Sequence, residues 1–403
     1  MNTYVAATWV HQLLLVCSFL LLSEPFFRST DGSTLIGSRL RVEAAVVTPA
    51  ASSPLSSPVI GVFSQPRQFK DPFRPRMPDD DEYPFYIASS YGKWIEAGGA
   101  RCIVVPYDAS PSLLDDLFTQ IHALFLPGGG AAMSPAIEYM IQKAVQSNAQ
   151  GHYFPVWGTC LGFEFLVRYF GNDTHADTLL ENDFDAQNIS LSLENVVSQS
   201  LYKDTFMYRT VTTQNVTLNN HNRGIRPEAF QSIIGLHKHF VITSTNVDQR
   251  GKPFVSTMEP RHLDDFPFYG VQYHPEKNAF EYGTYPGTNI PFEVIDHSDD
   301  AVRFSLDMAR SFVRLARQTM LLNGDRHAYT QPSRFPILTS YPVRPGLAFE
   351  QIYVVPPAAK WSQISRQRML NGLTGTEEAP KGAGNIPARS FVRRRSVKDE
   401  SVP

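Results

Sequence analysis

The chain has 403 residues, of which 42% are apolar and 19% are charged, so it can bury at least one sizeable core and has room for up to three domains. Its net charge of -3 is close to neutral, and its 36 lysines and arginines are scattered except near the C-terminus. This balance excludes the basic surface of a typical nucleic-acid-binding protein and favours a small or neutral partner.

The N-terminal segment predicts a secretory signal peptide at residues 1–24. The apolar run from Leu13 to Leu22 is shorter than the roughly 20 residues of a membrane-spanning helix and matches a signal core. No basic residue precedes the run, so a signal anchor remains the alternative. Glycosylation sequons at Asn172, Asn188 and Asn215 agree with the secretory pathway. We therefore expect no stable membrane span, and a lysosome-like, vacuolar or extracellular location.

Three cysteines are too few for a disulfide framework. Cys17 would leave with the signal peptide. Cys102 lies in the apolar stretch "RCIVVPY" and is expected to be a small core residue. The remaining pair, Cys102 and Cys160, leaves two possibilities open: one structural bridge, or a buried thiol together with a reactive one.

The rest of the chain divides by composition. Residues 25–57 are rich in Ser, Thr, Ala and Pro and predict a low-complexity pro-segment or linker. Strand and helix signals then alternate, with strands at 59–63, 102–106, 123–126 and 154–157 and helices at 86–97, 112–122 and 135–146. This alternation predicts an α/β fold with a mostly parallel sheet covered on both faces.

Shorter strands follow in hairpin-like order, in "FVITST", "PFVSTME" and "YGVQY". A helix from Ala301 to Leu322, capped by Ser298 or Asp299, closes a domain that we place at residues 58–325. Prolines and basic residues accumulate in the extension at 326–403, and the run from Arg393 to Arg395 is interpreted as a solvated or processed tail.

The stretch "FPVWGTCLGFEF" places Cys160 at the turn between a strand and a helix. A residue at such an elbow has a strained backbone, so its neighbours two positions away must be small, and Gly158 and Gly162 meet this need. The N-terminus of the following helix would favour the thiolate and present the N–H of Leu161 to an oxyanion. We expect Cys160 to be a nucleophile; the alternative is a buried structural cysteine.

The base that such a thiol needs is expected in "YGVQYHPEKNAFEYG". His274 follows a strand, at the carboxyl side of the sheet where active sites of α/β proteins lie. Glu276 is placed to orient its imidazole, in the manner of a nucleophile, base and orienter triad. A salt bridge from Glu276 to Lys277 or a nearby arginine is the alternative.

Consecutive glycines end another strand, in "LFLPGGG". The unhindered N–H groups of Gly129 and Gly130 would complete the oxyanion hole with Leu161. The spacing does not fit a phosphate-binding loop.

These motifs in this order resemble the gamma-glutamyl hydrolases, of the class I glutamine-amidotransferase-like superfamily. The resemblance implies a flavodoxin-like three-layer α/β/α sandwich and a cysteine hydrolase that cuts gamma-glutamyl bonds, notably of folylpoly-gamma-glutamates. It implies that Cys160, His274 and Glu276 are catalytic and that His221 lies on the substrate side of the cleft. Arg67 and Glu164 are expected to contact the substrate as well.

The sequence has no cluster with metal-ligand spacing, and we expect neither a metal nor a cofactor. A homodimer is compatible with the sequence. Two other functions stay open: a glutaminase-type amidotransferase subunit, and a non-catalytic secreted binding protein on the same fold. An iodoacetamide-sensitive hydrolase assay distinguishes the enzyme from the binding protein.

Overall fold

The computed structural model describes residues 57–67, 81–172, 179–197, 200–263, 266–285, 287–323, 335–346 and 349–361. The predicted signal peptide, almost all of the predicted linker and the arginine run near the C-terminus lie outside these residues. In the described part of the chain, no helix has the length and apolar character needed to cross a membrane.

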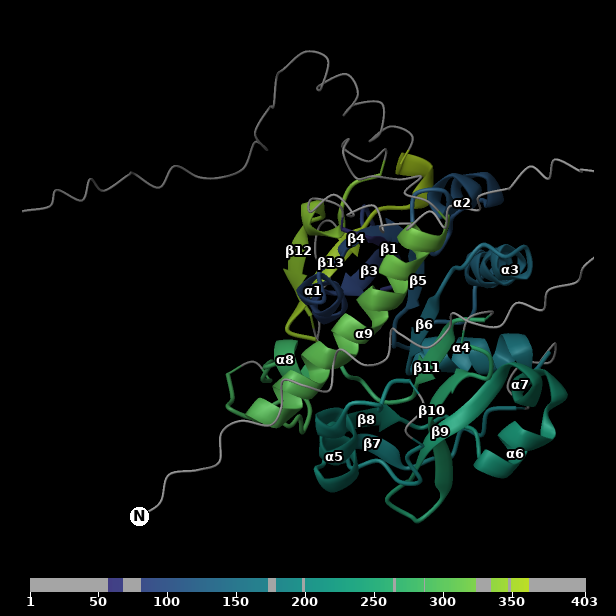
Figure 1. Cartoon of the computed structure of the whole chain (residues 1–403). Coiled ribbons are helices and arrows are strands. Elements are labelled where there is room, and N and C mark those ends of the chain that lie inside the picture. The colour runs from purple at the N-terminus through teal and green to yellow at the C-terminus, as the bar shows by residue number, and fades with distance from the viewer. Residues whose placement is uncertain are drawn as a thin grey trace, which may run out of the picture. The chain divides into compact units, whose positions relative to one another are not determined.

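A seven-stranded central sheet carries the fold (Figure 1). Its order is β4 (Arg101–Val105), β1 (Val59–Phe63), β5 (Ala123–Leu126), β6 (Val156–Thr159), β11 (Phe268–Val271), β10 (Pro253–Pro260) and β9 (Phe240–Val247). The first five strands run parallel to one another, and β10 pairs antiparallel with both β11 and β9. The mixed α/β class and the mostly parallel, flavodoxin-like sheet predicted from the sequence are confirmed.

Two smaller sheets are antiparallel. One has the order β12 (Val343–Pro345), β13 (Gln351–Val355), β3 (Phe85–Ala88) and β2 (Gln65–Pro66). The other pairs β7 (Ala186–Leu191) with β8 (Thr217–His221). Residues 335–361, which the sequence analysis placed in the C-terminal extension, thus contribute two strands to a sheet that starts near the N-terminal end of the domain.

Helices lie on both faces of the central sheet (Figure 1). They are α1 (Ser89–Ala97), α2 (Pro111–Phe118), α3 (Pro135–Ala149), α4 (Leu161–Phe170), α5 (Thr205–Thr213), α6 (Pro227–Ser232), α7 (Ile234–His239), α8 (Lys277–Phe280) and α9 (Asp299–Asn323), with 3₁₀ turns at Leu338–Ser340 and Ala358–Lys360. The hydroxyl of Ser298 accepts the N–H of Ala301, so the predicted cap of the last helix is present.

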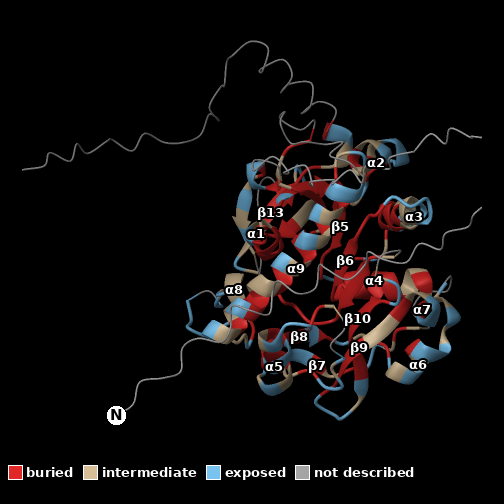
Figure 2. Cartoon of the chain, viewed as in Figure 1, coloured by how far each residue is buried: buried red, intermediate tan, exposed pale blue. Residues whose placement is uncertain are grey.

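Buried residues of α1 and α9 pack against the middle strands of the sheet, which are themselves buried (Figure 2). The rings of Trp94, Phe125, Trp157 and Phe312 pack together there, and the indole N–H of Trp94 donates to the carbonyl of Ser305 at 2.8 Å. Aromatic packing of this kind makes the middle of the sheet a rigid platform for the loops at its carboxyl edge.

Local predictions differ from the structure in several places. The helix expected over 86–97 begins only at Ser89, because Phe85–Ala88 pairs with β13. The strand before the elbow runs from Val156 to Thr159 rather than over 154–157, and β11 ends at Val271 rather than at Tyr273. Cys102 is fully buried, as expected, and it forms no bridge with Cys160.

Candidate active site

Cys160 occupies a sharp turn between β6 and α4. Its φ of 49° and ψ of -105° are unusual for a residue with a side chain. A Cβ atom on Gly158 would lie 2.4 Å from the carbonyl oxygen of Gly162, and one on Gly162 would lie 2.0 Å from that of Leu126. Both glycines are therefore required for the backbone to turn this closely against β5.

His274 and Glu276 meet this elbow from the turn after β11. The N–H of His274 donates to the carbonyl of Leu218 in β8 at 2.9 Å, which fixes the turn. Nδ1 of His274 lies 2.8 Å from Oε1 of Glu276, and the imidazole is hydrogen-bonded to Cys160. All three side chains are at least 95% buried. The structure thus brings together the three residues that the motifs singled out.

The charges around His274 favour the imidazolium. Burial alone would lower the pKa of His274, but the negative charges of Glu276 and Cys160 outweigh it and raise this pKa to about 10. The alternative ion pair between Glu276 and Lys277 does not form, because the Lys277 ammonium binds the carboxylate of Glu293 instead.

Tyr91 joins this group, although the sequence analysis did not select it. Its hydroxyl oxygen accepts the N–H of Gly128 at 2.9 Å and lies 3.4 Å from Nδ1 of His274. Burial, together with the charges of Glu276 and Cys160, holds the pKa of Tyr91 well above its usual value, so the phenol keeps its proton. Nothing in the local sequence distinguishes Tyr91 from a core residue of an amphipathic helix.

The glycine loop after β5 lies against the same elbow. A Cβ atom on Gly128 would lie 2.6 Å from Cε1 of His274 and 3.2 Å from Cβ of Cys160. The side-chain amide of Gln65 donates to the carbonyl of Gly128 at 2.8 Å. A Cβ atom on Gly129 would lie 1.9 Å from Oε1 of Gln65. Gly129 and Gly130 are exposed, which leaves their backbone open to a ligand.

Leu161 is the first residue of α4, where backbone N–H groups have no acceptor within the helix. The N–H of Gly128 is already used by Tyr91. The candidate oxyanion donors are therefore Leu161, Gly129 and Gly130.

His221 ends β8 and is 5% exposed. Burial lowers the pKa of His221 to about 4; the hydrogen bond to the carbonyl of Arg223 opposes this, and the nearby His274 adds to it. The imidazole is therefore neutral at pH 7, and Nδ1 donates to that carbonyl at 2.6 Å. The surrounding sequence "TLNNHNRG" predicts a loop at the carboxyl edge of the sheet, whereas the structure places His221 at the end of a strand.

The other two predicted substrate contacts are buried side chains. Arg67 follows Gln65, which contacts the glycine loop, by two residues. It is 5% exposed, and its guanidinium donates to the carbonyl of Tyr83 at 3.1 Å. Glu164, in the first turn of α4, is 4% exposed and accepts a long hydrogen bond of 3.4 Å from the Gln272 amide.

The remaining histidines lie elsewhere. In the sequence, His237 and His239 stand just before "FVITST", and period-2 alternation predicts both on one face at the entry of that strand. In the structure they belong to α7, so this prediction is wrong. His239 packs its ring against Phe170 and Phe266. His262 is exposed, as expected for a polar turn.

Comparison with known proteins places this chain in a family. The model of the class-I glutamine amidotransferase family matches residues 87–292. Gamma-glutamyl hydrolase 1 of Arabidopsis thaliana is 32% identical over 286 residues, which cover 68% of this chain and 77% of the relative. Gamma-glutamyl hydrolase B of Dictyostelium discoideum is 30% identical over 275 residues (66% and 73%), and the gamma-glutamyl hydrolase of Mus musculus is 34% identical over 242 residues (58% and 72%). The chain therefore belongs to the gamma-glutamyl hydrolases, within the class-I glutamine amidotransferase family.

Proposed function

We propose that this protein hydrolyses gamma-glutamyl bonds, as the names of its relatives state for them, and that its substrates are folylpoly-gamma-glutamates and similar poly-gamma-glutamyl compounds. The observation that supports this most directly is the elbow cysteine hydrogen-bonded to an imidazole that Glu276 orients. In this proposal Cys160, His274 and Glu276 are the catalytic residues.

The first half of the reaction forms a thioester. The Cys160 thiolate attacks the gamma-carbonyl carbon, and the developing oxyanion accepts hydrogen bonds from the N–H groups of Leu161, Gly129 and Gly130. The C–N bond then breaks, and the His274 imidazolium gives its proton to the leaving amine. A pKa of about 10 keeps that proton on the imidazole at neutral pH until the amine leaves.

The second half returns the enzyme to its starting state. Neutral His274 takes a proton from water, which attacks the thioester carbon. The C–S bond breaks, the glutamate gamma-carboxyl group is released, and the thiolate and imidazolium pair is restored. His221, Arg67 and Glu164 are the proposed substrate contacts, with the cation of Arg67 matched to the carboxylates of a polyglutamyl chain.

We place the protein in the secretory pathway, in a lysosome-like or vacuolar compartment or outside the cell. The exposed side chains of Asn172, Asn188 and Asn215 support this, because glycosylation needs an accessible sequon. Deglycosylation of the protein purified from its natural source, followed by mass measurement, tests the proposal.

The reaction is tested with pteroylpentaglutamate and the purified protein, with the products read by mass spectrometry. Release of glutamate or shorter glutamyl chains supports the proposal, and the product lengths distinguish endo from exo cleavage. Ammonia release from glutamine without cleavage of the pentaglutamate would support the glutaminase alternative. Absence of both activities would support a binding protein.

Cys160→Ser is expected to lower turnover by more than about a thousandfold, because a hydroxyl does not supply the thiolate that attacks the carbonyl. Cys102→Ser is the matched control, since Cys102 is equally buried but lies in β4, outside the site. Initial rates and thermal unfolding of both variants are measured together. A Cys160→Ser protein that keeps more than a thousandth of the rate would contradict the assignment of the nucleophile.

A further inference from the structure

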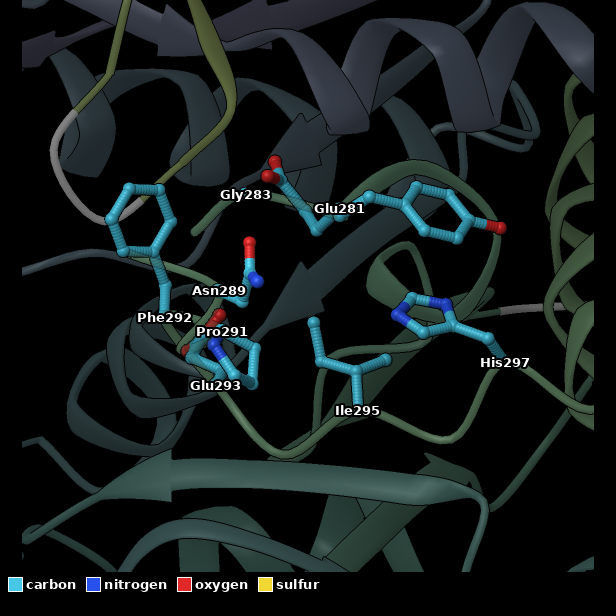
Figure 3. A pocket seen from close by; sticks show the side chains of 9 residues that line it. Glu281, Gly283, Asn289, Pro291, Phe292, Glu293, Ile295 and His297 are labelled. Atoms are coloured by element: carbon cyan, nitrogen blue, oxygen red, sulfur yellow. The ribbon is translucent and has the colours of Figure 1, made fainter. Parts of the chain in front are cut away.

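A second buried ion pair lies next to the His274 and Glu276 pair. Lys277 follows Glu276 directly in the chain and is 3% exposed, and its ammonium donates to both carboxylate oxygens of Glu293, which is 6% exposed. Asn220 donates to one of these oxygens at 2.6 Å. Glu293 comes from the segment between α8 and α9, where it lines a pocket of about 250 Å³ (Figure 3).

Only one of the two carboxylate oxygens of Glu276 has a hydrogen-bond partner in the described part of the chain. Oε1 binds His274, whereas Oε2 is buried. A buried ammonium that loses its partner leaves an uncompensated charge, which is strongly destabilising. Without Glu293, two buried carboxylates with an oxygen that is unpaired among the described residues remain near the Lys277 ammonium: Glu281, with which it already interacts, and Glu276, where it would compete with His274 for the negative charge.

We propose that Glu293 is a positioning residue that keeps the Lys277 ammonium away from Glu276, so that Glu276 keeps its negative charge for His274. Two hydrogen bonds fix the backbone next to Glu293. The N–H of Val294 donates to the side chain of Asn188 at 2.6 Å, and the hydroxyl of Ser190 donates to the carbonyl of Val294 at 2.8 Å. The inference rests on the proposed function only in assigning catalysis to His274.

The charged and titratable groups that face His274 come from four parts of the chain. They are Glu276 and Lys277 on its own turn, Cys160 at the elbow, Tyr91 on α1 and His221 on β8. Lys277 already lowers the pKa of His274 from its place beside Glu293. Burial lowers the pKa of His274, and Glu276 is the group that raises it most. An ammonium bound to Glu276 would offset this effect.

The test uses Glu293→Gln, which keeps the side-chain shape and an acceptor for Asn220 but removes the negative charge. The His274 imidazole is titrated by NMR on protein labelled with ¹⁵N-histidine, and its midpoint is expected to move at least about one pH unit towards neutrality. The alkaline limb of the rate profile is expected to move in the same direction. Glu194→Gln, at an exposed carboxylate distant in sequence, is the control and should leave both unchanged.

The double variant Lys277→Met and Glu293→Gln distinguishes positioning from simple anchoring. Removing the competing ammonium is expected to return the His274 midpoint to at least its wild-type value. A midpoint unchanged in folded Glu293→Gln would overturn the inference, as would a lowered midpoint that the double variant does not restore. If Glu293→Gln does not fold but the double variant does, the Lys277 ammonium has found no partner in Glu276, and the inference is overturned. The NMR readout needs no turnover, so an inactive wild-type protein would count against the proposed function only.

Discussion

The hydroxyl of Tyr91 connects two parts of the candidate site, because it accepts the N–H of Gly128 and lies beside the His274 imidazole. Tyr91→Phe removes this hydroxyl and leaves the ring in place. We expect kcat to fall about 10- to 100-fold, which corresponds to about 1.4–2.7 kcal/mol, because the glycine loop and the imidazole lose a common support.

Steady-state kinetics of Tyr91→Phe should show this loss in kcat, with KM nearly unchanged. Tyr139→Phe is the control, because it removes a hydroxyl that donates to Asp115 at the surface of α2 and α3. Equal rates for the wild-type protein and Tyr91→Phe would show that the hydroxyl only fills space.

At the residue scale, the sequence was sufficient to predict those features of the candidate site that depend on a few consecutive residues. The glycines around Cys160 and the two-residue spacing of His274 and Glu276 are contiguous motifs, so their geometry could be expected. Tyr91 could not be found this way, because its role depends on a loop 37 residues away. The pairing of Lys277 with Glu293 was missed for the same reason.

At the scale of elements, β3 shows why one boundary was wrong. Phe85–Ala88 continues the amphipathic pattern of α1, but its backbone pairs with β13, more than 250 residues later in the chain. A local pattern carries no information about such a partner. α7 is the opposite case, a short helix where alternation suggested the entry of a strand.

Because β3 leads directly into α1, the strand pairing also sets the position of Tyr91. Val354→Asp places a charge at a fully buried position of β13 and is expected to destabilise the protein by about 3 kcal/mol, with loss of turnover in the same temperature range. Val343→Asp on β12, where the side chain is 43% exposed, should cost little. Thermal unfolding followed in parallel with activity checks this; identical melting temperatures for the two variants would contradict it.

For the whole molecule, the alternation of strands and helices was sufficient to predict a parallel sheet, because each local period and each turn signal points to the same class. The hairpin-like order expected for "FVITST" and "PFVSTME" is confirmed by the antiparallel pair β9 and β10. The attachment of residues 335–361 to a second sheet was beyond the reach of these local patterns. It depends on contacts between distant segments and on which sheet edge is left open.

Buried His221 is expected to make the stability of the whole molecule depend on pH. Its pKa is about 4 in the folded protein and about 6.5 when the chain is unfolded, so the unfolded state binds more protons between these values. The free energy of unfolding should therefore decrease as the pH falls from about 6.5 to 4. His221→Asn should show a smaller decrease over this interval in melting temperatures. A larger or equal decrease in the variant would show that the imidazole is protonated in the folded state.

The backbone of Cys160 has a consequence for evolution as well as for chemistry. A side chain at φ 49° and ψ -105° is strained, and glycine would relieve the strain while removing the thiol. Cys160→Gly is therefore expected to unfold at a higher temperature than Cys160→Ser, by an amount equivalent to about 1 kcal/mol. If calorimetry finds the glycine variant less stable, the elbow is not strained. If it finds the gain, this protein keeps a less stable fold in exchange for its nucleophile, and stability alone would select against the residue on which the reaction depends.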